Sequence, residues 1–393
     1  MKKLLILILF TTLVFNAQVN TEVYVFDIVE TAHKTTLQNE KNISNNLGYD
    51  SQPYFYDATT VIFSSARNGK TDIALYDLKM NRPGLNYISE TKNGGEYSPK
   101  RIPNSNDISA VRLDNDGLQR FYSYNFKTKE STALIANLKV AYPTWVDKNT
   151  VIAVAIVQDS LELFISDLKK KTNTSVAKMV GRSVHKIPNS NLVSFISKEN
   201  EKYWLLKSLH PVTKEIKTIT SVGTSEDVAW LPNGTLLLSR GNKIDQFNPQ
   251  KDKKPSLFYS FSDGNINNIS RMAIDKTGTK IALVAEISPK YLAQEQLEGY
   301  NQRDIDAFLK PYAKDVKVYN FPNELRYEGL ETMRKRYEGF FKNTQDLHCE
   351  LTNRIVFKNT VIDHELVTAN GRQFKAVAIY KIKNGKISSV TFM

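Results

Sequence analysis

Apolar and polar positions along the chain follow a unit that recurs between about residue 50 and residue 287. Each unit has a short apolar stretch, a turn rich in Asp, Asn, Pro or Gly, and then a run rich in β-branched residues. Short apolar runs bounded by turn residues predict β-strands rather than helices. The sequence Ile-Pro-Asn-Ser-Asn occurs twice in this pattern, at 102–106 and at 187–191. Successive turns lie 42 to 47 residues apart, at Asp57, Asn104, Asp147, Asn189, Asn233 and Asp275.

A β-rich run follows each of these turns, and a further run follows in several units. Asn68-Gly69 and Asp116-Gly117 precede two of the further runs, and such pairs supply the positive φ of tight hairpins. We therefore predict second strands at 60–63, 107–111, 151–154, 192–196, 236–239 and 281–284, and third strands at 72–78, 120–125 and 162–168.

A period of about 42 residues with three to four strands is that of one β-propeller blade. The stretch Ser51-Gln52-Pro53-Tyr54-Phe55, followed by 61–69 and 72–78, resembles the repeat of TolB-like six-bladed propellers, a PD40 or WD40-like repeat. Tyr97-Ser98-Pro99 and Tyr142-Pro143-Thr144-Trp145 match the opening of the same repeat. The resemblance implies a six-bladed propeller over residues 18–287. An irregular β-sandwich is the alternative.

The last unit stops after its second strand, at about residue 285, whereas residues 22–28 carry a third-strand pattern with no strand before it. We expect this N-terminal segment to supply the outer strands of the sixth blade. Ring closure by both ends of the chain removes the open edge that a repeat array would otherwise expose.

The character of the chain changes near Ser288-Pro289. Helices are expected at 291–300, 304–312 and 330–341, and strands at 347–357, 361–368, 374–382 and 387–392. Helices followed by an antiparallel sheet make an α+β domain over residues 288–393. The fold class is thus mainly β plus α+β.

The C-terminal segment resembles the SnoaL-like, steroid delta-isomerase-like branch of the nuclear transport factor 2-like (NTF2-like) family. The likeness rests on 300–306 (Tyr-Asn-Gln-Arg-Asp-Ile-Asp), 327–329, 354–356, 361–365 and 376–380 with 384–387. It implies a sheet curled around an apolar pocket that the helices close. Three positions at which the isomerases carry their base and their oxyanion-hole groups fall on Asn320, near Gln296 and near Ile379. Because these side chains cannot take those roles, isomerase chemistry of that type is not expected.

Other polar groups in this segment are candidates for acid/base chemistry. Asp363 and Glu365 share one face of their strand, and His348 is the third candidate catalytic residue. A carboxylate beside Arg354 makes either an anion clamp or a structural ion pair, and both interpretations stay open. The expected ligand-binding residues are mostly aromatic, because aromatic rings carry the largest apolar area: Tyr300, Phe308, Tyr312, Tyr319, Asn320, Phe321, Tyr337, Phe340 and Arg354.

Residues 1–17 have two lysines followed by a 12-residue apolar run at 4–15. The run is shorter than the roughly 20 residues of a membrane span, so we expect a signal peptide and a periplasmic or secreted mature protein. An uncleaved N-terminal anchor is the alternative. The formal net charge is +12, but the charges are spread through turns, so nucleic-acid binding is not expected.

No nucleotide, dinucleotide or hydrolase motif and no metal-ligand spacing occurs, so we expect neither cofactor nor metal. The favoured hypothesis is an exported binding protein. The propeller would be its recognition scaffold, and the NTF2-like domain would hold a small apolar ligand or form a dimer. A small acid/base enzyme of isomerase, dehydratase or hydrolase type, with the propeller as a targeting module, is the alternative. A carbohydrate or peptide site on the propeller is the third.

Overall fold

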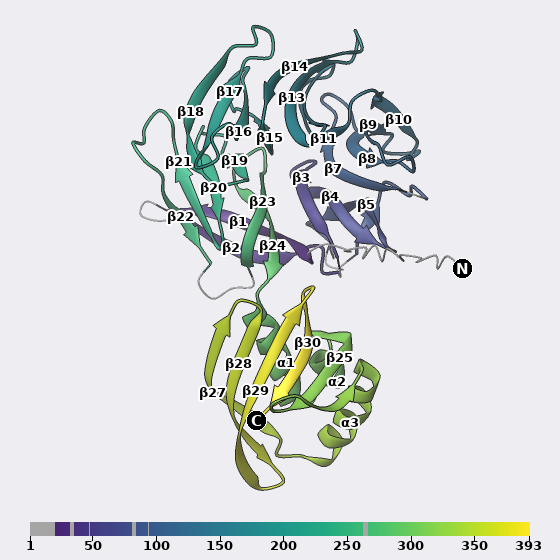
Figure 1. Ribbon diagram of the computed structural model, residues 1–393, viewed down its shortest axis with the longest axis vertical. Helices are drawn as coiled ribbons and strands as arrows, with labels where there is room; N and C mark the ends of the chain where they lie inside the picture. The colour runs from purple at the N-terminus through teal and green to yellow at the C-terminus, as the bar shows by residue number, and fades with distance from the viewer. Residues whose placement is uncertain (1–19, 32–34, 47, 81–83, 93, 262–265) are drawn as a thin grey trace, which may run out of the picture.

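A computed structural model of the chain describes residues 20–31, 35–46, 48–80, 84–92, 94–261 and 266–393. The expected signal peptide at 1–17 lies outside the described residues. Within these residues the strands form six four-stranded sheets and one six-stranded sheet. The four-stranded sheets are arranged around a common axis, and the six-stranded sheet lies beside them in a separate unit (Figure 1). The predicted propeller is confirmed, and the β-sandwich alternative is excluded.

The first three blades follow one another along the chain, and each runs from an inner to an outer strand in antiparallel order. The predicted second and third strands of these blades all fall on observed strands. The bounds are β3 (Asp50–Phe55), β4 (Thr60–Arg67), β5 (Lys70–Asp77) and β6 (Asn86–Tyr87); β7 (Gly95–Arg101), β8 (Ile108–Leu113), β9 (Gln119–Tyr124) and β10 (Ser131–Ile135); and β11 (Val140–Asp147), β12 (Thr150–Val157), β13 (Ser160–Asp167) and β14 (Thr172–Lys178).

The last three blades repeat this order, except that the sixth takes its outer strands from the N-terminus. The bounds are β15 (Val180–Lys186), β16 (Val193–Ser197), β17 (Trp204–Leu209) and β18 (Ile216–Gly223); β19 (Val228–Trp230), β20 (Leu236–Arg240), β21 (Lys243–Phe247) and β22 (Ser256–Ser260); and β23 (Ile266–Ile274), β24 (Lys280–Ile287), β1 (Thr21–Glu30) and β2 (Thr35–Asn42).

Strand β1 closes the ring as the sequence predicted. It pairs antiparallel with β24 from Thr21 opposite Glu286 to Asp27 opposite Lys280. Its side chains are buried on both faces: Val23 packs with the first blade, and Phe26 packs with the fifth and sixth. The N-terminal strand therefore joins first and last blades by hydrogen bonds and by core packing.

The repeated Ile-Pro-Asn-Ser-Asn segments form the same turn in the second and fourth blades. In both, the isoleucine amide donates to a carbonyl five residues on, Asp107 in one and Leu192 in the other, at 2.9 Å. Asn104 and Asn189 adopt φ of 59° and 55°, a left-handed conformation that Asn tolerates better than most residues. The turn chemistry thus explains why the segment is repeated.

A hydrogen bond between neighbouring blades accompanies this turn. Trp145 Nε1 donates to Ser109 Oγ at 2.8 Å, and Trp230 Nε1 donates to Ser194 Oγ at 2.9 Å. Each serine lies on the strand that follows the repeated segment, and each tryptophan lies on the inner strand of the next blade. The indole buries its apolar area between blades while its N–H is satisfied.

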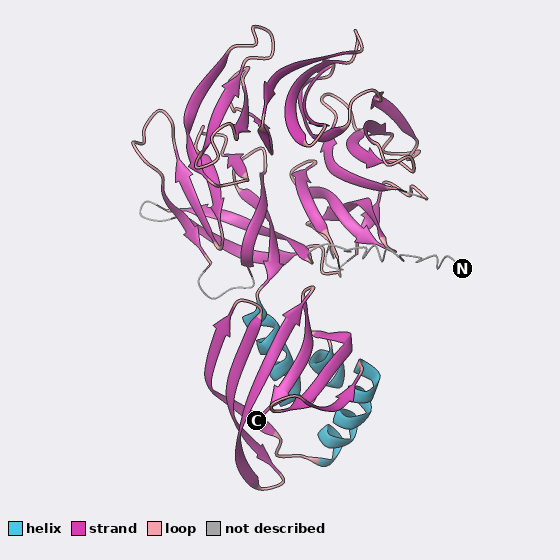
Figure 2. Cartoon of the chain, in the orientation of Figure 1, coloured by secondary structure: helices cyan, strands magenta, loops and turns pink. Residues whose placement is uncertain are grey.

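The C-terminal unit contains every helix in the described part of the chain (Figure 2). Its six-stranded sheet has the order β26-β25-β30-β29-β28-β27, and β25 pairs parallel with β30, so the sheet is mixed rather than purely antiparallel as expected. The bounds are α1 (Pro289–Gln302), α2 (Ile305–Leu309), β25 (Tyr312–Asn320), β26 (Glu324–Glu328), α3 (Leu330–Asn343), β27 (His348–Phe357), β28 (Thr360–Ala369), β29 (Arg372–Lys383) and β30 (Lys386–Phe392).

The predicted helix at 304–312 is too long. Helix α2 ends at Leu309, and Tyr312 begins a strand that the sequence did not predict. Tyr312, Val316 and Val318 are buried, at even spacings that suit one face of a strand. The spacing of Phe308, Leu309 and Tyr312 also fits a helix, so the apolar pattern did not distinguish a helix from a strand at residue 312.

The junction between the two units is short, because β24 ends at Ile287 and α1 begins at Pro289. That it is a domain boundary stays a prediction, which limited proteolysis checks. No helix in the described residues is long and apolar enough to span a membrane.

Candidate functional site

A cavity of about 440 Å³ lies between the sheet of the C-terminal unit and its helices. All three helices and strands β25 to β30 contribute to its wall, so the whole unit is built around it. The lining residues are Gln296, Leu297, Tyr300, Phe308, Tyr312, Arg326, Tyr337, Phe340, Cys349, Glu365, Val367, Phe374, Lys375, Ala376, Tyr380, Phe392 and Met393.

Aromatic rings make the helical side of this wall. Phe308 lies at its centre, with ring centroids 4.5 Å from Tyr337, 5.4 Å from Tyr312 and 5.9 Å from Tyr300. Phe340 packs against Tyr300 at 6.5 Å. These separations are those of favourable tilted and edge-to-face pairs. The helical side of the wall is therefore largely aromatic, with phenol oxygens and the Gln296 amide as its polar groups.

A chain of hydrogen bonds crosses the cavity wall and ends on a carboxyl group. Tyr312 Oη donates to Gln296 Oε1 at 3.2 Å, and Gln296 Nε2 donates to Tyr380 Oη at 2.9 Å. Tyr380 Oη in turn donates to Glu365 Oε1 at 3.2 Å. Because Tyr380 donates its hydroxyl hydrogen to Glu365 Oε1, this hydrogen bond favours a single orientation of the Glu365 side chain.

Glu365 is the group in this chain of hydrogen bonds whose pKa is shifted toward neutral pH. The pKa of Glu365 is raised to about 7, first by burial and second by the negative charge of neighbouring Asp363, against the hydrogen bonds from Tyr380 and Cys349. Burial also raises the pKa of the Cys349 thiol, so a thiolate is disfavoured there. The cavity therefore holds a carboxyl group that exchanges a proton near neutral pH.

Asp363 has a different role from Glu365. It is completely buried, and both of its oxygens accept from Arg354, from Nε and from Nη2, at 2.7 Å each. Arg354 Nη1 also donates to Gln294 Oε1 on α1 at 2.9 Å. In a bidentate ion pair of this kind, both oxygens of the carboxylate accept hydrogen bonds from the guanidinium group. Of the two interpretations left open, the structural ion pair describes Asp363 and Arg354, and neither residue lines the cavity.

The other expected site residues separate into two groups. Tyr300, Phe308, Tyr312, Tyr337 and Phe340 line the cavity together with Glu365. The remaining ones lie elsewhere: Tyr319 and Asn320 are on β25 outside the lining, Phe321 is 57% exposed, and His348 is exposed at the start of β27. For the residues that line the cavity, participation in binding or catalysis stays a prediction. For the residues outside it, the geometry gives no support for such a role.

Tyr380, Arg326 and Lys375 line the cavity but were not among the expected site residues. Tyr380 belongs to a segment that carried the family resemblance. Its backbone pairs with Val361 on β28, and its hydroxyl group reaches Glu365, four residues further along the same strand. Among the described residues, no group of three or more His, Cys, Asp or Glu side chains is placed to hold a metal ion.

Comparisons with known proteins match a family model to the C-terminal unit and a solved fold to the propeller. The family model described as SnoaL-like domain matches residues 293–390. No curated protein matches the chain. A solved structure from Agrobacterium tumefaciens that carries the name TolB has 11% identity and a TM-score of 0.53, covering 68% of this chain and 98% of its own.

Solved structures also match the C-terminal unit alone. An NTF2-like protein of unknown function from Cytophaga hutchinsonii has 19% identity and a TM-score of 0.25, covering 28% of this chain and 91% of its own. A cystatin-fold protein from Novosphingobium aromaticivorans has 24% identity and a TM-score of 0.26, covering 27% and 98%. The chain thus consists of a six-bladed β-propeller with the fold of the TolB structure, followed by a SnoaL-like domain that the family model matches at residues 293–390.

Proposed function

We propose that the SnoaL-like domain binds a small, largely apolar molecule in its cavity, with Glu365 and Tyr380 as the polar contacts. The observation that carries this proposal is an aromatic-walled cavity of about 440 Å³ with a buried carboxyl group in it. Small-molecule sites are concave, mostly apolar and furnished with a few convergent polar groups. Arg326 and Lys375 add positive charge to the same wall, which suits a ligand with a polar or anionic end.

A second candidate function, proton transfer on the bound molecule, is favoured by one further observation. A carboxyl group whose pKa is about 7 is present in both protonation states at neutral pH, which is the condition for efficient general acid–base catalysis. Glu365 would be the proton-transfer group, and Tyr380 the residue that orients it. Isomerisation and dehydration are reactions of this class.

We further propose that the chain is exported and that its propeller is a recognition scaffold. The support for export is the sequence pattern of residues 1–17. Cell fractionation, with mass spectrometry of the mature N-terminus, tests it. Dimerisation through the SnoaL-like domain stays a prediction, and light scattering coupled to size-exclusion chromatography checks it.

The binding proposal is tested with 2-naphthol, an apolar aromatic probe with one hydroxyl group, by isothermal titration calorimetry on the full-length protein. Ala376→Phe places a ring in the cavity, whereas Phe321→Ala removes an exposed ring outside it. We expect binding to the parent and to Phe321→Ala, and a loss of at least tenfold in affinity for Ala376→Phe. Equal affinity in all three proteins, or no binding to the parent, would contradict the proposal.

A further inference from the structure

The inner strands of the six blades enclose a channel along the propeller axis. At its middle is a small cavity of about 70 Å³, which we call the throat, and wider cavities of about 750 and 770 Å³ adjoin it. Arg182 lines the throat and the first wide cavity, whereas Lys100 and His185 line the throat and the second. The three cavities therefore follow one another through the propeller.

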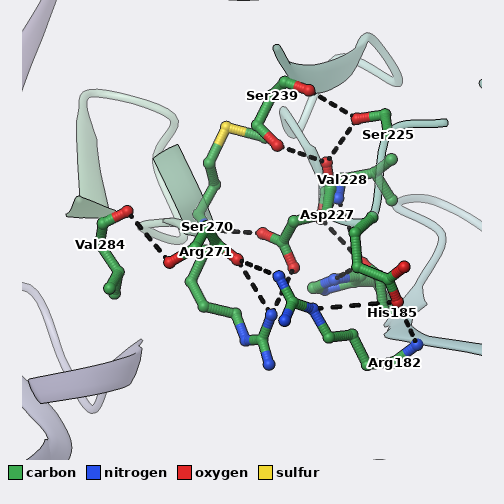
Figure 3. A network of polar contacts seen from close by, with 12 residues as sticks. Arg182, His185, Ser225, Asp227, Val228, Ser239, Ser270, Arg271 and Val284 are labelled. Carbon is green, nitrogen blue, oxygen red and sulfur yellow. Dashed lines mark hydrogen bonds and ion pairs between the residues drawn. The ribbon is translucent and has the colours of Figure 1, made fainter. Parts of the chain in front are cut away.

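Three cationic side chains converge on the throat from three blades. Arg182 comes from β15 and Arg271 from β23, and their guanidinium groups lie beside the Asp227 carboxylate (Figure 3). Lys100 comes from β7, and among the described residues Asp227 is the one carboxylate in the lining of the throat. Asp227 Oδ1 lies 3.9 Å from Arg271 Nη1, and Asp227 Oδ2 accepts a hydrogen bond from the backbone N–H of Met272 at 2.6 Å. Glu226, outside the throat lining, lies 3.9 Å from Arg182 Nε, and even with it two carboxylates do not neutralise three cations, so the throat is electropositive.

These cations retain hydrogen-bonding capacity that the protein does not use. Arg182 Nη2 and Arg271 Nη1 both donate to the carbonyl of Ser270, at 2.9 Å each. Arg182 Nε is buried and has no hydrogen-bond partner in the described residues, since its contact with Glu226 is 3.9 Å long. By contrast, all three nitrogens of Arg354 in the other domain have acceptors: Nε and Nη2 donate to Asp363, and Nη1 donates to Gln294. An unsatisfied buried N–H is costly unless something accepts from it.

The two wide cavities differ in charge, which gives the channel a direction. The one that shares Lys100 with the throat is also lined by Arg101, Lys186 and Lys276, and by no carboxylate of the described residues. We call it the basic mouth. The opposite cavity is lined by Glu226 and Glu286 together with Arg182 and Arg240, so its formal charges balance. The repeated Ile-Pro-Asn-Ser-Asn turns lie at the basic mouth, with residues 102–104 and Pro188 in its wall.

We propose that the basic mouth admits a small molecule with a carboxylate or phosphate group, and that Lys100, Arg182 and Arg271 bind this group in the throat. A cavity of about 70 Å³ suits one such group, while the basic mouth has room for the rest of the molecule. Guanidinium and ammonium groups form short, charge-assisted hydrogen bonds to these oxyanions. A mouth lined by one sign of charge raises the local concentration of the oppositely charged ligand. This site is separate from the SnoaL-like cavity and does not depend on its function.

Isothermal titration calorimetry on the full-length protein at pH 7 and low salt tests the site. The probes are inorganic phosphate and succinate, with succinamide as the uncharged match of succinate. Lys100→Met keeps the length of the side chain and removes its charge, and Lys127→Met does the same at an exposed position outside the channel. We expect Lys100→Met to weaken binding at least tenfold and Lys127→Met to leave it unchanged.

Each outcome decides the proposal. Binding of phosphate alone, of succinate alone or of both supports it and identifies the oxyanion. Binding of neither, binding of succinamide equal to that of succinate, or equal affinity in Lys100→Met and the parent overturns it, the last indicating an adventitious ion only. If Lys100→Met does not fold, Lys276→Met replaces it, because Lys276 is exposed at the basic mouth. A two- to threefold loss is then expected, and no change overturns the proposal.

Discussion

Replacement of Glu365 by glutamine should abolish a pH dependence of stability that originates in the SnoaL-like cavity. The pKa of Glu365 is raised from 4.5 in an unperturbed chain to about 7 in the folded protein. A carboxyl group of this kind binds its proton more tightly in the folded state, so folding stability decreases as pH rises from 4.5 to 7. At about 1.4 kcal/mol per pKa unit, the decrease is about 3 kcal/mol, and it is complete above pH 7.

Glutamine keeps the shape of the side chain and an oxygen that accepts from Tyr380 Oη, but it does not titrate. The stability of Glu365→Gln relative to the parent should therefore increase by about 3 kcal/mol as the pH rises from 4.5 to 8. The neighbouring Cys349 and Tyr380 do not disturb this window, because their pKa values are raised further above it by burial.

Differential scanning calorimetry of both full-length proteins, at four pH values between 4.5 and 8, measures this difference. For a domain of about 100 residues, a stability difference of 1 kcal/mol corresponds to a shift of about 4–8 °C in melting temperature. The difference in melting temperature of the SnoaL-like domain between the two proteins should therefore change by more than 10 °C from pH 4.5 to pH 8. A difference between the two proteins that is the same at every pH would refute the account of Glu365.

Three further changes test the packing. Arg354→Met leaves Asp363 buried without its partner and should destabilise the SnoaL-like domain by about 3–5 kcal/mol in urea denaturation, whereas adding Asp363→Leu should recover much of the loss; equal stability of single and double variants would contradict this. Deletion of residues 18–30 removes β1 and should markedly lower the melting temperature of the propeller; unchanged melting would show that ring closure contributes nothing. Trp230→Phe removes the inter-blade hydrogen bond to Ser194 and should cost about 1 kcal/mol in urea denaturation; no loss would show that this bond is not stabilising.

The propeller could be predicted from the sequence because its determinants are local. Each turn is specified by its own residues, as in the positive φ of Asn104 and Asn189, and the period repeats the information six times. Ring closure by β1 could also be predicted, because residues 22–28 had a strand pattern without a partner.

The sites were less predictable because they depend on which strands become neighbours. The alternation of β28 placed Asp363 and Glu365 on one face, but their different roles arise from Arg354 on β27 and Tyr380 on β29. In the channel, Lys100 and Arg271 belong to inner strands far apart in the sequence. Closure of the ring brings them together, and no spacing along the chain signals it.

The central claim is that the Glu365 carboxyl group faces a ligand cavity and exchanges its proton near neutral pH. Carboxyl ¹³C NMR of the full-length protein, titrated with and without 2-naphthol and assigned through Glu365→Gln, tests it directly. We predict a pKa of about 7 for Glu365 and a shift of its resonance when 2-naphthol is added. An ordinary pKa near 4.5, together with a resonance that 2-naphthol does not move, would contradict the account.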